Sequence, residues 1–272
     1  MVLMHGKIKE TAKLMRQKIL NVSHYCNLST HLGGGLSMVE IMATLYTEIL
    51  KFDTKNPRWE GRDRFILSKG HGVLGYFSAL VAVGIISDEI FNTFQSNESD
   101  LIAHPVMNMD LGIESSNGSL GQGLSMSVGI AYSAKKKQKD FHTFVLMGDG
   151  ECNEGSVWEA VMSAVQLKLD NLTVVIDYNK LQSDGKSSEI IDLGKLGQKF
   201  LSFGCNVIEV DGHNIQEILD AFKNNNINGM PKVIVANTIK GKGISFMENN
   251  NEWHHNRLTK TNYDLAMLEI EN

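Results

Sequence analysis

Cysteine and proline are both scarce in this sequence. Its 272 residues include three cysteines and three prolines. The cysteines (Cys26, Cys152 and Cys205) are far apart, odd in number and without a CxxC spacing. This pattern disfavours both a disulfide framework and a structural zinc site. Because no Pro-, Ser- or Gly-rich linker interrupts the chain either, we expect a single domain over residues 1–272.

The chain also lacks an excess of positive charge. Its formal net charge is -5 and its isoelectric point is near 6.0. Nucleic-acid binding needs a basic surface, so this composition predicts that nucleic acid is not a partner. The one basic run, at residues 135–139, follows an apolar helical pattern and is interpreted as a solvated helix end.

No long hydrophobic segment is present. The longest apolar run, at residues 76–86, is shorter than the about 20 residues that a membrane-spanning helix needs. The first residues, MVLMHGKIKETAK, have no apolar core followed by a cleavage site, as a signal peptide would. We therefore expect no membrane association and a cytoplasmic location.

Short β-rich runs alternate with segments of helical periodicity, for example the apolar residues at helical spacing in 156–169. Several of these runs are almost continuously apolar, as strands covered on both faces are. The predicted fold class is α/β, with a mostly parallel sheet and helices on both faces. Ligands bind such sheets at the carboxyl ends of strands, so the loops after the runs are the candidate site. The runs are residues 65–68, 143–148, 172–177, 206–210 and 232–239.

Two glycine-rich stretches resemble nucleotide motifs but fail on their context. The stretch 70–75 reads GxGxxG, which in dinucleotide-binding proteins is followed about 20 residues later by an acidic residue at the end of a second strand. Here the acidic residues follow Ser87, which looks like the N-cap of a helix. The GKS at 185–187 lacks a P-loop's first glycine, since Lys180 stands there. An NAD-dependent dehydrogenase is therefore disfavoured.

A third glycine-rich stretch, residues 116–136, leads into a helix. Its glycines, at 118, 121 and 123, allow close approach by another helix or by a ligand. The free amides at such a helix start can bind an anion. On this feature alone, a tightly packed helix and an anion site are both open.

Asp149 and Asn179 each follow an apolar strand, with one helix between the strands. Successive parallel strands are usually neighbours, so the two side chains should lie at adjacent strand ends. A carboxylate and an amide oxygen are hard donors suited to a magnesium-class ion that also binds a diphosphate. The glycines on both sides of Asp149, Gly148 and Gly150, allow backbone amides to approach phosphate. Each residue alone could simply serve a turn.

The segment from Gly148 to Asn179 resembles the thiamine-diphosphate motif of transketolases and related enzymes. It reads GDG, 28 intervening residues and then Asn. The 2-oxo acid dehydrogenases and decarboxylases share this motif, but further segments look like transketolase and occur in transketolase order. The resemblance runs from about residue 10 to residue 255 and is to the N-terminal, pyrophosphate-binding subunit of a two-chain transketolase. The further segments are residues 24–42, 66–72, 104–106, 114–131 and 149–160.

The resemblance implies a thiamine-diphosphate-binding fold of the pyrophosphate type, whose cofactors are thiamine diphosphate and a divalent metal ion. Mg²⁺, or alternatively Ca²⁺ or Mn²⁺, would be ligated by Asp149, Asn179 and the backbone carbonyl of Leu181. The residues it places against thiamine diphosphate are His71, Gly118, Ser119, Leu120, Gly148, Asp149, Gly150, Glu151 and Asn179.

The same resemblance implies a set of catalytic histidines and glutamates. His31, His71 and His104 match histidines of the substrate channel, although Thr30 and Leu32 depart from the glycine and proline more often found beside the first of them. Because histidine changes charge near pH 7, such residues suit proton transfer at a sugar carbonyl.

A last active-site histidine is expected in the tail at residues 252–256. It is either His254 or His255, since the family has His-Gly here and the register is open. Glu154 and Glu159 match acids between two cofactor sites. The remaining histidines that we interpret as structural are His5, His24, His142 and His213.

By resemblance, the function is transfer of a two-carbon ketol unit between sugar phosphates, in the pentose phosphate pathway. The glutamate that activates the cofactor belongs, in this family, to a pyrimidine-binding domain that the present sequence does not contain. We therefore expect a partner chain that carries the pyrimidine-binding and C-terminal domains, an α2β2 assembly, and no activity without the partner. A two-chain enzyme for a 2-oxo acid or an unusual sugar and a non-catalytic scaffold domain remain as alternatives.

Overall fold

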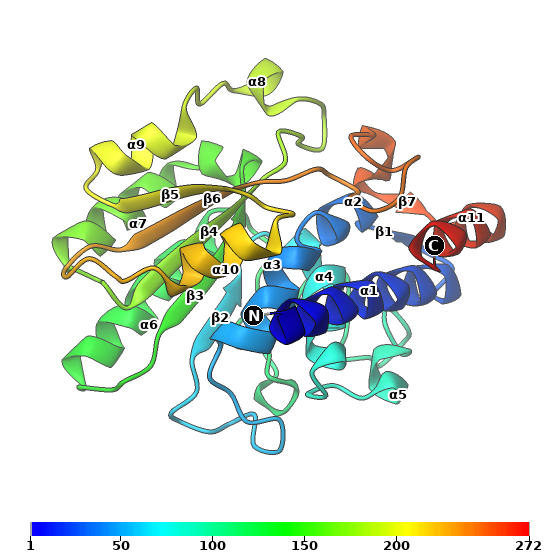
Figure 1. Ribbon diagram of the computed structural model, residues 1–272, viewed down its shortest axis with the longest axis horizontal. Coiled ribbons are helices and arrows are strands. Elements are labelled where there is room, and N and C mark those ends of the chain that lie inside the picture. Colours follow the sequence, from blue (N-terminus) through cyan, green and yellow to red (C-terminus); the bar gives the residue numbers. More distant parts are fainter. Residues whose placement is uncertain (1, 272) are drawn as a thin grey trace.

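A five-stranded parallel sheet forms the centre of the protein (Figure 1). The computed structural model describes residues 2–271. The strand order is β2-β3-β4-β6-β5, and every pair is parallel. All five predicted strand runs are confirmed. The strands are β2 (Arg64–Leu67), β3 (Thr143–Gly148), β4 (Leu172–Tyr178), β5 (Asn206–Asp211) and β6 (Lys232–Asn237).

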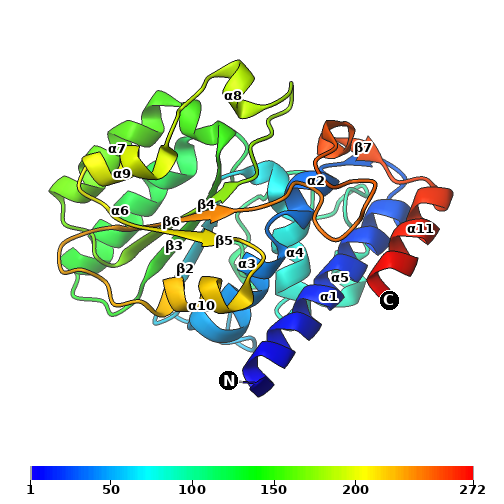
Figure 2. The ribbon, with the colours of Figure 1, turned by 45° about the horizontal axis from the view of Figure 1, so that its top comes forward.

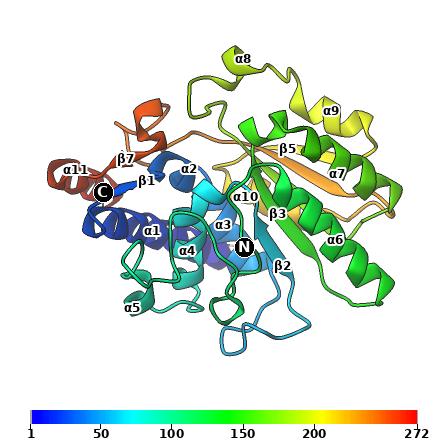
Figure 3. The ribbon, with the colours of Figure 1, turned by 180° about the vertical axis from the view of Figure 1, so that it is seen from behind.

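Helices cover both faces of this sheet, as the continuous apolar strands predict. Along β3, Phe144 and Leu146 belong to one buried cluster, whereas Val145 and Met147 belong to another. The first cluster includes residues of α1, α3, α4 and α10, and the second includes residues of α6, α7 and α9. Figure 2 shows these two sets of helices on opposite sides of the sheet, and Figure 3 shows α6 and α7 from behind.

The helix bounds follow the caps and turns of the sequence. The segment 68–142 between β2 and β3 contains helices and loops: a 3₁₀ turn at Gly70–Gly72 leads into α4, and the Ser87 hydroxyl then caps α5. The next strand of the sheet is β3, so the second strand of a dinucleotide motif is absent from this segment, as expected. The helices are α1 (Val2–Tyr25), α2 (Leu32–Leu36), α3 (Val39–Thr44), α4 (Val73–Ala82), α5 (Asp88–Phe91), α6 (Gln122–Lys136), α7 (Gly155–Gln166), α8 (Ser187–Ile190), α9 (Leu196–Ser202), α10 (Ile215–Lys223) and α11 (Lys260–Glu271).

A two-stranded antiparallel ribbon lies outside the main sheet and was not predicted. It pairs β1 (Ser29–Thr30) with β7 (Asn256–Arg257). The ribbon joins segments from opposite ends of the sequence, and α1 and α11 pack side by side next to it (Figure 1). Strands this short and polar carry no periodicity that distinguishes them from a loop.

Among residues 2–271, no helix is both long enough and apolar enough to cross a bilayer.

Candidate active site

An open cleft of about 1110 Å³ lies at the carboxyl ends of β2, β3 and β4. Three of the five loops expected to form a site contribute to it directly, and the loop after β6 lies behind its wall. The loop after β5 does not line it. The lining residues are His31, Lys69, His71, His104, Gly118, Leu120, Gly148, Asp149, Gly150, Glu151, Asn153, Glu154, Asn179, Leu181, Gln182, Ser183, Asp184, Ile191 and His254.

Asp149 and Asn179 stand at adjacent strand ends, since Gly148 of β3 pairs with Asp177 of β4. Asp149 is 4% exposed, and its carboxylate accepts a hydrogen bond of 2.7 Å from the Ser187 hydroxyl. Burial raises the pKa of this carboxyl, the Ser187 hydrogen bond opposes the shift, and the charge of Asp177 adds to it. Among residues 2–271 no cationic side chain forms an ion pair with Asp149. A buried carboxylate in this state fits a bound cation.

The neighbouring donors fit the same ion. The Asn179 side-chain oxygen accepts a hydrogen bond of 3.1 Å from the Leu181 amide, which turns the chain back over the cleft. The described residues contain no group of three His, Cys, Asp or Glu side chains that could hold a metal. A site here would therefore combine Asp149 with the amide oxygen of Asn179 and a backbone carbonyl, a donor set suited to Mg²⁺ with water or phosphate completing it.

Two buried polar atoms in the cleft wall also lack a partner. They are Oδ1 of Asn153 and Nε2 of Gln182. Gln182 packs so closely on Gly150 that a Cβ there would lie 2.7 Å from its Cγ, so a larger residue would displace it. Buried polar atoms are normally hydrogen-bonded. Their state here indicates a polar ligand between the loops after β3 and β4.

Asp177 forms a buried ion pair with Lys69, which lines the cleft, and sequence reasoning missed this pair. Lys69 is 1% exposed and Asp177 is fully buried. The Asp177 carboxylate accepts hydrogen bonds from Lys69, from the hydroxyls of Thr238 and Ser37 (the latter at 2.5 Å) and from the Asn179 amide at 3.4 Å. Although burial would raise the pKa of Asp177, the charge and hydrogen bond of Lys69 lead the effects that lower it. The sequence feature that could have indicated this pair is an acidic residue, Asp177, inside the apolar strand β4, together with a lysine, Lys69, just after the apolar strand β2.

Lys240, in the loop after β6, was also missed. Its side chain is 2% exposed and lies behind the cleft wall. The ammonium donates to the carbonyls of Leu181 (3.3 Å) and Gln182 (3.1 Å) and lies 2.7 Å from Nδ1 of His254. Burial, reinforced by the charge of Lys69, lowers the pKa of Lys240 to about 8. Lys240 therefore joins the loop after β4 to the tail that carries His254.

Glu151 connects three loops of the site. Its carboxylate accepts hydrogen bonds from the amides of Gly121 (2.8 Å) and Gly148 (3.2 Å) and from the Ser68 hydroxyl. An internal carboxylate thus already occupies the amide at the start of α6, where an anion site was one open interpretation. Burial raises the pKa of Glu151 and these hydrogen bonds oppose the shift.

Five histidines gather at one side of the cleft. The ring of His31 is central, at centroid distances of 5.7 Å from His71, 5.9 Å from His104, 5.4 Å from His254 and 4.5 Å from His255. His254 lines the cleft and contacts Lys240, whereas His255 is exposed and does not line it. The structure thus favours His254 in the register that the sequence left open.

Four of these histidines, His31, His71, His104 and His254, have lowered pKa values, which favour the neutral ring. Burial, followed by the charges of its neighbours, lowers the pKa of His31 to about 3 and that of His254 to about 4. The pKa values of His71 and His104 are lowered as well, again chiefly by burial. The expectation of a charge change near pH 7 is therefore wrong for the ligand-free chain. The rings act there as neutral donors and acceptors.

The remaining candidates occupy less central positions. Glu154 lines the cleft and is exposed, and Glu159 lies on the exposed side of α7, outside the lining. Ser119 is exposed between Gly118 and Leu120, which do line it. Of the two predicted glutamates, Glu154 lines the cleft and Glu159 does not.

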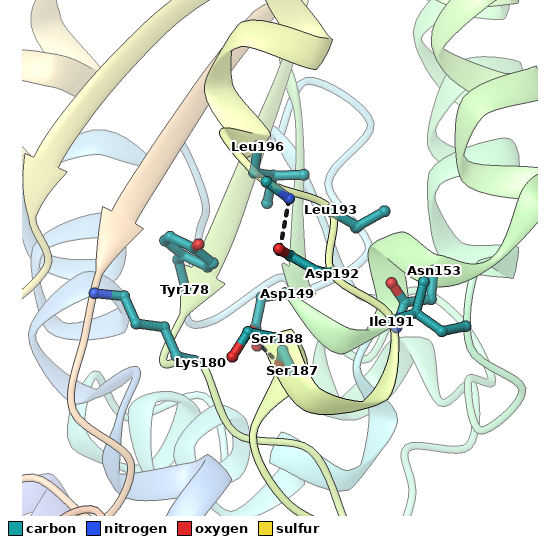
Figure 4. A pocket seen from close by; sticks show the side chains of 11 residues that line it. Asp149, Asn153, Tyr178, Lys180, Ser187, Ser188, Ile191, Asp192, Leu193 and Leu196 are labelled. Carbon is teal, nitrogen blue, oxygen red and sulfur yellow. Dashed lines mark hydrogen bonds between the residues drawn. The ribbon is translucent and has the colours of Figure 1, made fainter.

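A second, smaller cavity of about 470 Å³ shares Asp149 with the first (Figure 4). Its wall includes Tyr178, Lys180, Asp192 and Leu196, and α8 presents Ser187 to Asp149. The segment between β4 and α9 therefore contributes to the walls of both cavities and contacts the candidate metal ligand through Ser187.

Comparison with protein families identifies one match, described as "Transketolase, thiamine diphosphate binding domain", over residues 10–268. A relative from Actinobacillus succinogenes, named as one of the subunits of an apulose-4-phosphate transketolase, is 40% identical over 269 residues, which cover 99% of this chain and 98% of the relative. A 6-deoxy-6-sulfo-D-fructose transketolase subunit from a Clostridium species is 40% identical over 242 residues, or 89% of this chain and 88% of the relative.

Solved transketolases have the same fold. The crystal structure of transketolase from Campylobacter jejuni superposes with a TM-score of 0.91 at 29% sequence identity. The superposition covers 98% of this chain and 43% of that chain. The present chain thus spans less than half of a solved transketolase but nearly all of the relative from Actinobacillus succinogenes.

Proposed function

This chain belongs to the transketolase family of thiamine diphosphate-binding domains, and we propose that it is the N-terminal subunit of a two-chain transketolase-type enzyme. In this proposal residues 1–272 form a single cofactor-binding domain of a cytoplasmic transferase. A separate chain supplies the pyrimidine-binding and C-terminal domains, in an α2β2 assembly.

The observation that carries the proposal is the unsatisfied state of the cleft between β3 and β4. Asp149 is buried without an ion pair among the described residues, and Asn153 and Gln182 each present an unpartnered buried atom. A divalent ion held by Asp149, Asn179 and the Leu181 carbonyl would neutralise the first. A diphosphate oxygen could accept a hydrogen bond from Nε2 of Gln182, whereas Oδ1 of Asn153, an acceptor, would need a donor such as metal-bound water. We assign Mg²⁺ to this site.

Thiamine diphosphate, when bound, supplies the nucleophilic carbon and the electron sink for two-carbon transfer. The residues of this chain hold the diphosphate end, keep water away from the site and position the sugar. Neutral rings of His31, His71, His104 and His254 can each donate or accept a proton at a sugar hydroxyl or carbonyl. Such groups stay in place without adding charge to a cleft that already holds buried carboxylates.

The need for a partner follows from the chemistry of the cofactor rings. In the resemblance to transketolases, the carboxylate that activates the cofactor lies on the pyrimidine-binding domain, whereas the cleft described above offers the diphosphate end of the site. Two relatives are named as subunits, which supports a partner chain for this protein as well.

The sugar is the least constrained part of the proposal. Two-carbon transfer between ordinary sugar phosphates of the pentose phosphate pathway is one choice. The names of the two relatives favour a second, an unusual sugar such as apulose 4-phosphate or 6-deoxy-6-sulfofructose. In both cases the chemistry at this chain's histidines is the same, and the partner's residues would distinguish the substrates.

Binding and transfer test the proposal separately. Calorimetric titration of the co-expressed two-chain complex with thiamine diphosphate should give binding with Mg²⁺ and none with EDTA. A transfer assay should then compare xylulose 5-phosphate, apulose 4-phosphate and 6-deoxy-6-sulfofructose as donors, for the complex and for this chain alone. Mg²⁺-independent binding would contradict the metal site. Full activity of the chain alone would contradict the need for a partner.

A further inference from the structure

A buried ion network lies behind Lys240, on the side away from the cleft. Glu40, on α3, uses its two carboxylate oxygens for two different partners. Oε1 accepts a hydrogen bond of 2.5 Å from the Arg16 guanidinium of α1, and Oε2 lies 3.0 Å from Nδ1 of His213, in the turn after β5. The three side chains are 11–12% exposed. A buried network of this kind is costly unless every member is satisfied.

Both partners of Glu40 reach the same turn of the backbone. Nε2 of His213 accepts a hydrogen bond of 2.8 Å from the Ile239 amide, and Nε of Arg16 donates to the Lys242 carbonyl at 3.2 Å. These two backbone groups stand immediately before Lys240 and two residues after it. Glu40 thus anchors the outer ends of the turn that carries Lys240.

The hydrogen bonds also define the state of the histidine. Because Nε2 accepts from a backbone amide, the proton must be on Nδ1, where it is donated to Glu40. A second proton on Nε2 would face the Ile239 N–H and break that contact. The network therefore requires the Nδ1-protonated tautomer of His213 and an ionised Glu40. Buried ion pairs contribute little net stability, so we interpret the role of this network as fixing the geometry of the turn.

The turn has further contacts at its centre. The Gly241 amide donates to the Gly33 carbonyl at 3.0 Å, and the Asn249 amide donates to the Lys240 carbonyl at 2.9 Å. These bonds hold the centre of the turn, and the contacts of His213 and Arg16 hold its two ends. The side chain must extend from there to the carbonyls of Leu181 and Gln182 and to His254.

We propose that Glu40 and His213 are positioning residues that fix the turn at residues 239–242, and through it hold the Lys240 ammonium against the cleft wall and His254. His213, which the sequence suggested was merely structural, then acts on the cofactor site without touching it. The proposal rests on the proposed function, because the cofactor that the wall would hold is thiamine diphosphate with Mg²⁺.

Two substitutions at His213 separate the contacts. His213→Asn keeps a donor near the Nδ1 position and removes the acceptor for Ile239. His213→Gln places its amide oxygen near the Nε2 position and keeps that acceptor. We expect H213N to weaken Mg²⁺–thiamine diphosphate binding about three- to tenfold, and H213Q to stay within about twofold of the parent. The measurement is calorimetric titration of the two-chain complex.

A double-mutant cycle tests whether the effect passes through Lys240. Lys240→Met should itself weaken binding by about tenfold or more. In that background H213N should have almost no further effect, because the side chain that it misplaces is gone. The matched control is His142→Asn, which removes another buried histidine contact (2.8 Å from the Thr173 hydroxyl) at the amino end of the sheet. H142N should lower the thermal midpoint and leave the affinity unchanged.

The outcomes decide the proposal in each case. It is overturned if H213N lowers only the thermal midpoint, or if H213N and K240M weaken binding independently. If H213N does not assemble, Glu40→Gln replaces it, and parental affinity in E40Q would also overturn the proposal. Should the parent complex bind no thiamine diphosphate at all, the proposed function fails instead, and the two failures remain distinguishable.

Discussion

Two buried aspartates near the end of the β3–β4 pair differ in almost every other respect. Asp177, inside β4, has a lysine, two hydroxyls and the Asn179 amide as partners, and its pKa is lowered by Lys69 against the effect of burial. Asp149, just beyond β3, has the Ser187 hydroxyl, no ion pair within residues 2–271, and a pKa raised chiefly by burial.

The difference separates a structural charge from one kept for a ligand. The partners of Asp177 come from α2 and its surroundings, from the end of β2 and from the end of β6, so this residue joins the loops that form the floor of the site. The Asp149 carboxylate contacts the Ser187 hydroxyl and connects few segments. It lowers the stability of the folded chain, since an ionised carboxylate is buried without a counter-ion. Both residues are buried aspartates, so burial and residue type do not distinguish them. The number of hydrogen-bond and ion-pair partners within the protein indicates which of the two carboxylates is structural.

The largest expected effect is that of Asp149→Asn on the cofactor. Removing the charged ligand should weaken Mg²⁺-dependent thiamine diphosphate binding by about 100-fold or more. The cofactor-free chain should not be destabilised, because the substitution removes an unpaired buried charge. Calorimetry on the complex and thermal unfolding of the free chain measure the two quantities. A large drop in the thermal midpoint without cofactor would place Asp149 with Asp177, as a structural residue.

Asp177→Asn should have the opposite profile. It leaves the Lys69 ammonium buried without its partner, which should lower the free energy of unfolding by about 3–5 kcal/mol. Urea unfolding of the free chain measures this loss. The double variant Lys69→Met/Asp177→Asn should lose less than the sum of the two single variants, because the double variant leaves no uncompensated charge whereas each single variant leaves one. Additive losses would show that the pair is not a unit.

Acid should affect the two sides of the site in different pH windows. The pKa of His31 is lowered from 6.5 to about 3, so below pH 6.5 the unfolded chain takes up a proton that the folded chain does not. Stability from this group is therefore present above pH 6.5 and is lost as the pH falls toward 3, with a slope of at most about 1.4 kcal/mol per pH unit, reduced by partial exposure.

His31→Gln should flatten this part of the stability profile, as measured by urea unfolding at a series of pH values. Asp177, whose pKa is lowered, contributes stability that is present above the usual aspartate pKa of about 3.9 and is lost only as the pH falls further. If H31Q retained the parental slope between pH 6.5 and 4, the neutral, buried state of the cluster would be wrong.

The smallest expected effects come from the hydroxyls beside the two acids. Ser37→Ala removes one of four side-chain partners from a saturated carboxylate and should cost about 1–2 kcal/mol of unfolding free energy. Ser187→Ala removes the hydroxyl on Asp149 and should change stability by less than about 0.5 kcal/mol, since that carboxylate is already poorly accommodated. Equal losses in urea unfolding would remove the distinction between the acids.

The sequence was sufficient to locate Asp149 and Asn179 because their neighbourhood depends on one local rule. Consecutive parallel strands joined by a helix are adjacent, and the apolar runs marked both strand ends. Family resemblance then supplied the histidines, which lie in loops and carry no periodicity.

Lys69, Asp177 and Lys240 could not be placed in the same way. The Lys69–Asp177 contact joins β2 to β4 across the strand between them, and sequence order does not reveal which side chains turn inward at strand ends. Lys240 follows β6, whose position beside β4 reverses the chain order of β5 and β6. The choice between His254 and His255 likewise required the 3₁₀ turn at Asn251–His254 and the Lys240 contact.

The ribbon of β1 and β7 has a consequence for how the site is assembled. It pairs Ser29 with Arg257, so the ring of His31 meets His254 only when residues from opposite ends of the chain have found each other. Closing so long a loop has an entropic cost that local contacts do not repay. The last strand of the sheet ends at Asn237, and the candidate metal ligands Asp149 and Asn179 precede it in sequence. The candidate metal site therefore needs no contact between the two ends of the chain, whereas the histidine cluster does.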